Sequence, residues 1–558
     1  MRPILLILAV LVAFAGPAAR SQSAIGTHGA VATVDEIASR AGIDAMRKGG
    51  NAVDAAVAAA LTLGVVNGYN SGIGGGCFIL IRRSNGEVLC IDGRETAPAA
   101  ASRDMFLRDG KPDPSLSQLG ALASGTPGAL AAYDLALQSA GKLTLKEHLL
   151  AAARIAETGF PIDKHYAAAL RDSESDLARF PATASVFLKA GGAPYRKGEI
   201  LRQPDLARTY RAIAETGPAW FYGGTFAKSV ETWMTANHGL MTAADLRGYR
   251  AVLRPPISTD YHGCTVISFP PPSSGGVHLL EMLNILGAPR FSDMHLSAFD
   301  RVHIEAEAMK FAFADRAYWL GDPDFTKVPR GLISKGYAQT LAEKIDTAHV
   351  VPVPSHGTPA DEEPFSRHTT HLSAADDEGN WVALTQTVNT HFGSKVVIPG
   401  TGVVLNNEMD DFSAQPGAAN YFGLIGGEAN AIAPGKRPLS SMTPAIVLKD
   451  GKPILSVGAA GGPTIITATL NIILNVLDLG MDAQTAIDQP RFHHQWRPDE
   501  LNVERAMNPA LIEDLKKRGH IVRIMPAIAV AQAVGLALDG GGFLGAADPR
   551  AGGKALAW

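Results

Sequence analysis

The sequence predicts a large mixed α/β fold, and three observations lead to this prediction. Of its 558 residues, 46% are hydrophobic and 19% are charged, which is the composition of a globular protein with a large core. Apolar patterns with the period of a helix alternate with short β-rich runs along most of the chain. After residue 368 the pattern becomes mainly β-rich.

The first segment, "MRPILLILAVLVAFAGPAARSQSA" (1–24), predicts a secretory signal peptide. Arg2 precedes an apolar run from Ile4 to Ala15, and small residues suited to cleavage follow. Because the run is too short to span a bilayer comfortably, we expect no stable membrane span after its removal. The sequence thus predicts a periplasmic or secreted protein, with an uncleaved N-terminal anchor as the alternative.

Two helices are expected next. "TVDEIASRAGIDAMRKGG" (33–50) has acids in its first turn, basic residues in its last turn and Gly49 beyond its end. "NAVDAAVAAALTLGVV" (51–66) begins with a good N-cap, Asn51. Asp54 interrupts its apolar run, so we expect a buried helix rather than a membrane span.

The following segments predict a hairpin, a helical region and a linker. "CFILIRRSNGEVLCIDGRETAPAA" (77–100) carries β-rich arms around the turn signal "SNGE" (84–87). The stretch 120–345 is mostly helical in pattern. Residues 349–368 are rich in Pro, Ser and acids, which predicts a flexible, exposed linker and the strongest candidate boundary in the chain.

Charge and cysteine content exclude two classes. A net charge of −4 without a dense Lys/Arg cluster argues against nucleic acid as a partner. Three cysteines, Cys77, Cys90 and Cys264, are too few for a disulfide framework in a chain of this length, so we expect small buried side chains and one bridge at most.

A second hairpin after the linker gathers hydroxyl groups. Its arms flank "DDEGN" (376–380), where a three-residue loop, 377–379, places glycine where a left-handed conformation is needed. Counting outward puts Thr369 opposite Thr387, and the period of two adds Thr385 and Asn389 to that face. The opposite face is apolar. Such threonine pairs also stabilise sheets without any chemistry.

The place of Thr369 directly after the linker favours a catalytic role. A threonine hydroxyl is a weak nucleophile, and one way to activate it is to make the residue N-terminal, so that its own α-amine acts as the base. The α-amine has a reference pKa of about 7.7–8.0, so part of it is neutral near pH 7. This chemistry requires a cut before Thr369.

The sequence resembles the gamma-glutamyltransferases (glutathione hydrolases) of the N-terminal nucleophile superfamily. The resemblance runs from about Gly26 almost to the C-terminus, and it is carried by long motifs: "RKGGNAVDAAVAAALTLGVV", "SGIGGGCF", "DGRETAPAA", "PPPSSGG", "ADRAYWLGDPDF", "TTHLS", "NNEMDDFS", "GKRPLSSMTPAIV" and "QPRFHHQW". It implies a four-layer αββα sandwich and a precursor that cleaves itself. A large chain (25–368) and a small chain (369–558) would then form a heterodimer, without a cofactor.

The resemblance also implies the catalytic roles. Thr369 would attack the carbonyl of His368 during maturation and later the γ-glutamyl carbonyl of the substrate. Thr387 would hydrogen-bond and position this nucleophile. Gly461 and Gly462, in "GAAGGPTII", would offer backbone N–H groups to the oxyanion without side chains in the way.

Two further groups would bind the charged ends of a γ-glutamyl substrate. The α-carboxylate would be held by Arg94, Ser440 and Ser441, since a guanidinium can donate two parallel hydrogen bonds to a carboxylate. The α-ammonium would be held by Asn389, Glu408 and Asp411. The segment 416–427 resembles the family's lid loop, with Phe422 at the usual tyrosine position beside Tyr421. Cys77 also departs from the pattern, because a glycine is usual there.

The implied reaction is cleavage of the γ-glutamyl amide of glutathione and related compounds, with transfer to water or to an amino acid or dipeptide. One alternative is a cephalosporin or glutaryl acylase of the same fold, and another is an uncleaved, non-catalytic secreted binding protein. "SGIGGGC" lacks the ending of a phosphate loop, and "GYNSG" lacks the G-x-S-x-G spacing. "HHQW" and "HIEAE" match no zinc motif, so no metal is expected.

Overall fold

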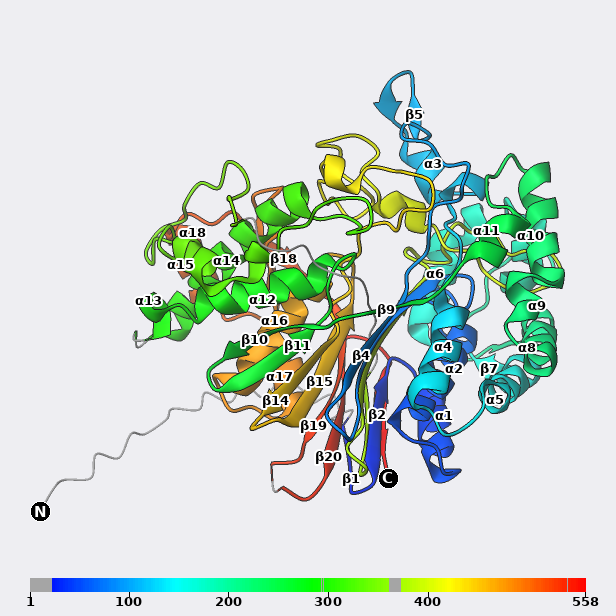
Figure 1. The fold of residues 1–558 in the computed structure, drawn as a ribbon, viewed down its shortest axis with the longest axis horizontal. Coiled ribbons are helices and arrows are strands. Elements are labelled where there is room, and N and C mark those ends of the chain that lie inside the picture. Colours follow the sequence, from blue (N-terminus) through cyan, green and yellow to red (C-terminus); the bar gives the residue numbers. More distant parts are fainter. Residues whose placement is uncertain (1–22, 293, 295, 361–372, 539) are drawn as a thin grey trace, which may run out of the picture.

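The computed structural model describes residues 23–292, 294, 296–360, 373–538 and 540–558. In these residues, two seven-stranded antiparallel sheets pack face to face, and helices cover the outer face of each sheet (Figure 1). The mixed α/β class and the αββα sandwich expected from the sequence are therefore confirmed.

The first sheet combines strands from both sides of the linker. Its order is β21 (Lys554–Ala557), β2 (Gly29–Thr33), β12 (Ser373–Asp376), β13 (Trp381–Thr387), β3 (Gly76–Arg82), β4 (Val88–Gly93) and β9 (Val252–Arg254). Because the β12–β13 hairpin pairs with β2 on one side and β3 on the other, the segments before and after the linker share one sheet.

The second sheet is built in the same interleaved way. Its order is β1 (Ala24–Gly26), β20 (Phe543–Ala547), β19 (Val530–Leu536), β15 (Lys452–Ala460), β14 (Ala445–Lys449), β11 (Cys264–Ser268) and β10 (Ile257–Tyr261). The region 120–345, expected to be mostly helical, thus also supplies three strands to the two large sheets, β9, β10 and β11. Each of them lies at or next to the edge of a sheet.

Helices cover both outer faces. Beyond the first sheet lie α1 (Glu36–Arg47), α2 (Ala52–Val66), α4 (Ala129–Ala140), α5 (Leu145–Thr158), α6 (Lys164–Leu177), α7 (Pro181–Phe187), α8 (Pro204–Thr216), α9 (Ala219–Tyr222), α10 (Thr225–Ala236) and α11 (Ala243–Gly248). Beyond the second sheet lie α12 (Ser274–Leu286), α13 (Pro289–Ser292), α14 (Ala298–Trp319), α15 (Lys335–Ala342), α16 (Thr464–Leu477), α17 (Ala483–Asp488) and α18 (Pro509–Lys517).

Short elements complete the fold. They are α3 (Pro114–Gln118), the 3-10 turns η1 (Ala121–Ala123), η2 (Arg330–Ile333), η3 (Glu408–Asp411) and η4 (Glu428–Asn430), and the small strands β5 (Leu107–Arg108), β6 (Lys111–Pro112), β7 (Phe160–Pro161), β8 (Ile200–Leu201), β16 (Phe492–His493), β17 (Leu501–Glu504) and β18 (Val522–Met525).

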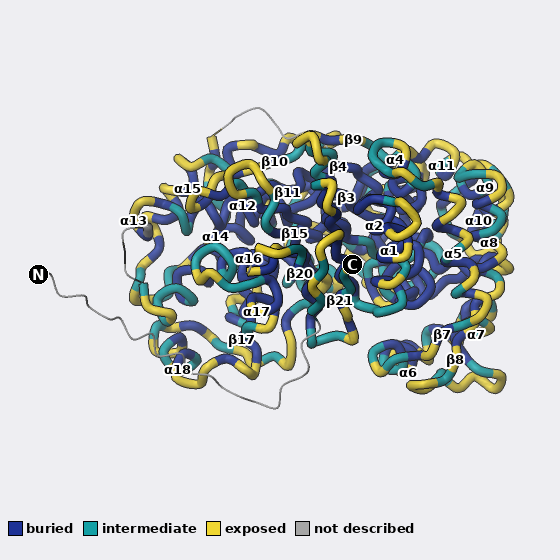
Figure 2. The backbone as a smooth tube through the Cα atoms, turned by 90° about the horizontal axis from the view of Figure 1, so that it is seen from below, coloured by how far each residue is buried: buried dark blue, intermediate teal, exposed yellow. Residues whose placement is uncertain are grey.

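The two N-terminal helices form as their sequence predicts. The Asn51 side chain caps α2, and Asp54 returns a bond to the Asn51 backbone, which completes a capping box. All fifteen residues of α2 are buried, and Figure 2 shows this helix inside the molecule. The Asp54 carboxylate also accepts bonds from the backbone N–H groups of Lys142 and Leu143. A charged residue thereby becomes a buried junction between α2 and the turn before α5.

The β12–β13 hairpin has the predicted register in its described part. Ser373 pairs with Ala383 and Ala375 with Trp381, and the loop closes between Asp376 and Asn380. The prediction of one apolar and one polar face is wrong, however. Trp381 and Ala383 share the face of Thr385 and pack between the two sheets, so only the end of that face is polar.

Many positions in the described part of the predicted linker, 349–360, are exposed as expected, but some of its residues are anchored to the folded part of the chain. Val353 is buried, and its carbonyl accepts a bond from the Trp496 indole at 2.7 Å. Further on, the Asp315 carboxylate accepts the Gly357 N–H at 2.6 Å. Apolar residues and buried acceptors along its path therefore fix this segment against the helical layer of α14.

Three smaller expectations concern the cysteines, membrane spans and the signal peptide. Cys77, Cys90 and Cys264 are buried thiols rather than disulfides, as expected. Among the described residues, none of the helices combines the length and apolarity needed to cross a bilayer. The signal-peptide prediction falls on residues 1–24, of which 1–22 lie outside the described part, so it stays a prediction.

Candidate active site

Every predicted site residue that the structure describes lines one pocket of about 320 Å³. These residues are Arg94, Thr387, Asn389, Glu408, Asp411, Tyr421, Phe422, Ser440, Ser441, Gly461 and Gly462. They come from six separate segments, which the two sheets and their connections bring together. His368 and Thr369 lie outside the described residues, so their predicted roles remain untested.

Arg94 is the buried cation of the pocket. It directly follows β4, and its guanidinium bonds to Glu408 and, at 2.5 Å, to Asp411. Its Nε donates to the carbonyl of Pro438 at 3.0 Å. The two acids that the resemblance assigns to a substrate ammonium are therefore paired with Arg94 in the structure without ligand.

The charges around Arg94 do not balance. Glu95 lies on the same side, with a carboxylate oxygen 3.7 Å from Nη1, so three carboxylates surround one guanidinium. Burial raises the pKa values of Glu408 and Asp411 and raises that of Glu95 to about 7, against the opposing attraction of Arg94. The pocket thus has the electrostatic character of a cation-binding site around one fixed positive charge.

Ser440 and Ser441 present hydroxyl groups that can donate to a ligand. The Ser440 Oγ accepts the Met442 N–H at 3.1 Å, and the Ser441 Oγ accepts Nη2 of Arg316 at 3.2 Å. Since each oxygen already accepts a bond from the protein, its proton is left to donate, which suits a carboxylate ligand. Arg316 was missed by the sequence argument, although it lies in the quoted motif "ADRAYWLGDPDF".

The two glycines form a turn between β15 and α16. Gly461 has φ of 141° and Gly462 has φ of 59°, both in the region that favours glycine. A Cβ at Gly462 would lie 2.5 Å from the Phe422 ring. The turn directly precedes α16, whose N-terminal end favours negative charge, so it is suited to an oxyanion.

Thr387 and Asn389 close the side of the pocket next to the hairpin. β13 ends at Thr387, and Asn389 has φ of 77°, so the predicted strand alternation does not reach Asn389. Asn389 still lines the pocket, because its N–H donates to the Thr387 Oγ1 at 2.7 Å and its amide donates to the carbonyl of Asn407 at 3.0 Å. A side chain-to-backbone turn replaces the expected strand.

The predicted lid residues differ in exposure. Phe422 packs over Gly462, whereas 56% of Tyr421 is exposed at the rim. The Asn420 side chain fixes the loop by accepting the N–H groups of Phe422 and Leu424, each at 3.1 Å. Cys77, the other departure from the family pattern, is buried in β3 and is not among the residues that line this pocket.

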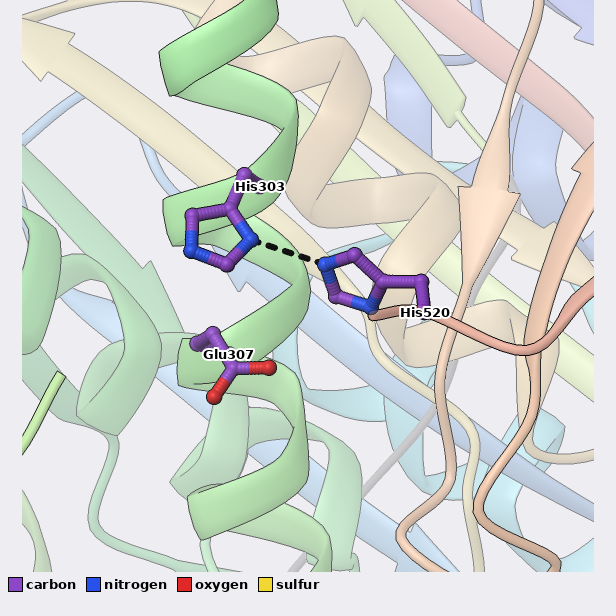
Figure 3. A group of neighbouring side chains, drawn as sticks. All are labelled: His303, Glu307 and His520. Atoms are coloured by element: carbon purple, nitrogen blue, oxygen red, sulfur yellow. Dashed lines mark hydrogen bonds between the residues drawn. The ribbon is translucent and has the colours of Figure 1, made fainter. Parts of the chain in front are cut away.

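A separate cluster of His303, Glu307 and His520 lies in the helical layer of α14 (Figure 3). The His303 Nε2 bonds to the carbonyl of Asp346 at 2.8 Å, so Nδ1 is the acceptor for the His520 Nε2, also at 2.8 Å. Burial lowers the pKa of His303 and, mainly, that of His520, to about 3. The two rings therefore form a neutral hydrogen-bonded pair that links α14 to the segment that follows α18.

Comparisons with known proteins agree with this geometry. The family model for Gamma-glutamyltranspeptidase matches residues 38–558. The chain is 45% identical to the glutathione hydrolase proenzyme of Escherichia coli (strain K12) over 527 residues, which cover 94% of this chain and 90% of that relative.

Solved structures give the same picture. Cephalosporin acylase from Bacillus halodurans aligns with a TM-score of 0.85 at 29% identity, covering 99% of each chain. Gamma-glutamyltranspeptidase from Helicobacter pylori aligns at 37% identity with a TM-score of 0.56, covering 57% of this chain and 92% of that one. From its fold, its pocket and these matches, the chain belongs to the gamma-glutamyltranspeptidase family of N-terminal nucleophile enzymes.

Proposed function

We propose that this enzyme cleaves the γ-glutamyl amide bond of glutathione and related compounds through a γ-glutamyl-threonine intermediate. The observation that carries the proposal is the joint presence, in one pocket, of a buried guanidinium, two carboxylates and two donor hydroxyls. A γ-glutamyl group ends in a zwitterion, and a site must answer both of its charges.

The internal ion pairs of Arg94 support binding of a zwitterion. Both Glu408 and Asp411 pair with the guanidinium, so Arg94 is not left as an unpaired buried cation. A bound γ-glutamyl group would insert its carboxylate near Arg94, Ser440 and Ser441. Its ammonium would in turn pair with Glu408 and Asp411, and the Asn389 side chain would also bind it. Each charged group keeps an opposite partner, so the exchange costs little electrostatic energy.

The nucleophile in this proposal is Thr369. If the register of the described hairpin continued for four more residues, Thr369 would lie opposite Thr387, which lines the pocket. The Thr369 hydroxyl would first attack the His368 carbonyl and displace the amide nitrogen, which frees the α-amine and leaves an ester. Hydrolysis of that ester would then free the hydroxyl and give His368 a carboxylate. The products would be a large chain, 25–368, and a small chain, 369–558. Because the sheets interleave both parts, these chains would remain together as a heterodimer.

Turnover would then follow two acyl-transfer steps. Thr369 attacks the γ-carbonyl with its amine as base, and the N–H groups of Gly461 and Gly462 stabilise the oxyanion. The leaving amine departs with a proton, which leaves an ester on Thr369. Water or the amine of an amino acid or dipeptide then attacks this ester, and the product carries the γ-glutamyl group away. None of these steps requires a cofactor.

The acids of the pocket favour a γ-glutamyl group over a glutaryl group. A glutaryl side chain has the carboxylate but lacks the amine, so Glu408 and Asp411 would have no ligand partner. The signal-like segment 1–24 supports a periplasmic or secreted location for this activity.

One assay tests the proposal against its alternatives. We expect γ-glutamyl-p-nitroanilide to be cleaved much faster than glutaryl-p-nitroanilide, with added glycylglycine accelerating release if an amine is a good acceptor. Faster cleavage of the glutaryl substrate would establish the acylase alternative. A single full-length chain without activity on either substrate would establish the non-catalytic binding protein.

A further inference from the structure

Arg316 is a buried cation that bonds to Ser441 of the pocket and to Ser274, which in turn bonds to Ser440. It lies near the C-terminal end of α14, is 5% exposed, and is not among the residues that line the pocket. Its Nε donates to the Ser274 Oγ at 2.9 Å, and its Nη2 donates to the Ser441 Oγ at 3.2 Å. Although burial lowers its pKa to about 10, the group is charged at neutral pH.

The contacts of Arg316 reach both serines of the pocket. Ser274, which accepts from Arg316, donates its own hydroxyl to the carbonyl of Ser440 at 2.7 Å. Because a guanidinium only donates, Ser274 must use its proton on Ser440, and Ser441 must turn its proton away from Arg316. Arg316 therefore acts directly on the direction of the Ser441 hydroxyl. Through Ser274 it adds one bond to a Ser440 backbone that the Ser274 N–H and the Pro272 carbonyl also hold.

The two serine hydroxyl groups matter for carboxylate binding because the N–H donors of Arg94 already bond to other groups of the protein. Its guanidinium serves Glu408, Asp411 and two backbone carbonyls, Pro438 and Leu439. A carboxylate that enters the pocket must therefore share Arg94 with the protein, whereas the hydroxyl groups of Ser440 and Ser441 can donate to it. The hydroxyl pair is then an important part of carboxylate recognition.

We propose that Arg316 is a positioning residue for the α-carboxylate of the substrate, and that it acts through the hydroxyl of Ser441. This inference rests on the proposed γ-glutamyl specificity, because it requires a carboxylate at the serine pair. Arg316 contributes binding that is present in the ground state and the transition state alike, so its loss is expected in KM rather than in kcat.

The test compares two substrates that differ only in the α-carboxylate: γ-glutamyl-p-nitroanilide and 4-aminobutyryl-p-nitroanilide. We expect Arg316→Met to raise KM for the first substrate roughly 10-fold, the size of one hydrogen bond involving a charged group, with kcat little changed. The second substrate should change by less than about 2-fold. Arg301→Met, on the same helix but bonded to Asp478 rather than to the pocket, is the matched control and should leave both substrates unchanged.

A double-mutant cycle tests the route through Ser441. If Arg316 acts through that hydroxyl, Arg316→Met combined with Ser441→Ala should be little worse than Ser441→Ala alone. Additive losses, or equal losses on the two substrates, would overturn the inference. If Arg316→Met does not fold, as thermal unfolding would reveal, Arg316→Lys and Ser274→Ala replace it with the same expected discrimination and the same overturning results.

The outcomes also separate this inference from the proposed function. If Ser441→Ala itself fails to discriminate between the two substrates, the serine pair does not bind the carboxylate, and the proposed substrate contacts are wrong. If Ser441→Ala discriminates but Arg316→Met and Arg316→Lys do not, the substrate contacts stand and the role of Arg316 is refuted.

Discussion

Arg94 and Asp411, 317 positions apart in the sequence, meet in the pocket with Nη2 and Oδ2 at 2.5 Å. The arginine directly follows β4 in the first sheet, and the aspartate ends the η3 turn after the hairpin. Their pairing brings together a segment from each side of the linker. It also means that Arg94 has a structural role in addition to any contact with substrate.

Arg94→Ala tests both roles. Neither residue is assigned to the bond before Thr369, so we expect the variant to be cut into two chains. Its kcat/KM for γ-glutamyl-p-nitroanilide should fall by a factor that corresponds to a loss of about 2–5 kcal/mol of transition-state stabilisation, because the substrate carboxylate would bind without its cationic partner. Stability should also fall, since Glu408 and Asp411 remain buried without a cation.

Arg94→Lys and Arg83→Ala complete that experiment. Lysine should rescue both properties only in part, because a point charge cannot reproduce the fork. Arg83, half-buried in the turn before β4 and paired with Glu87 away from the pocket, is the control and should be silent. Gels, kinetics and thermal unfolding provide the readouts. Near-normal kcat/KM in processed Arg94→Ala would remove Arg94 from the substrate site and reopen the acylase alternative.

Thr369→Ala should remain full length and inactive. Without the hydroxyl, nothing attacks the His368 carbonyl, and the α-amine that serves as base in turnover is never released. The measurement is a denaturing gel of the purified protein beside the p-nitroanilide assay. Normal two-chain processing in this variant would show that the nucleophile is another residue.

Glu95→Gln should stabilise the protein at alkaline pH. Burial raises the pKa of Glu95 from 4.5 to about 7, so the folded state binds this proton more tightly than the unfolded state does. Stability from this group is therefore complete below about pH 4.5 and is lost as the pH rises through 7, by at most about 3 kcal/mol. Neither carboxylate oxygen has a hydrogen-bond partner among the described residues.

The measurement for Glu95→Gln is the melting temperature at pH 5 and pH 8. The variant should gain over the parent protein mainly at pH 8, while Glu87→Gln, exposed in the preceding turn, should show no such difference. A gain of equal size at both pH values would show that Glu95 does not titrate between them.

Local structure could be predicted from the sequence more accurately than the burial of individual residues. The charged end turns of α1, the Asn51 cap of α2 and the loop of the second hairpin depend on neighbouring residues, and all of them formed as expected. The prediction that one face of that hairpin would be polar was wrong, because a second sheet, distant in sequence, covers Ala383. The described part of the linker is anchored because its apolar residue Val353 meets Trp496, which no local pattern indicates.

The site shows the same division. The resemblance supplied residues that the fold does gather into one pocket, which spacing alone could not do. It did not indicate that Arg94 would be paired with Glu408 and Asp411, because a motif specifies residue types and not their partners. Arg316 escaped notice for a related reason: its contacts depend on how α14 packs against the serine turn.

Gly462→Ala should inactivate the enzyme because its new methyl group clashes with the Phe422 ring, and removing that ring should restore part of the activity. The new Cβ would lie 2.5 Å from Cδ1 of Phe422, and alanine at φ of 59° adds about 1–2 kcal/mol of backbone strain. The turn that offers N–H groups to the oxyanion, or the lid above it, must then shift. Gly451→Ala is the matched control, because its φ is 74° and nothing lies within 4 Å of its Cβ.

Phe422→Ala distinguishes the clash from the strain. Alone, it should weaken lid closure and reduce kcat/KM modestly. Combined with Gly462→Ala, it removes the ring that the new methyl group meets, so the double variant should recover much of the activity lost in Gly462→Ala. The loss that remains should reflect backbone strain alone, which Gly451→Ala measures at a site without a clash. Steady-state kinetics of the four proteins beside the parent provide the comparison. If the double variant is no better than Gly462→Ala, contact with Phe422 is not the cause, and the glycine is needed for its backbone conformation alone.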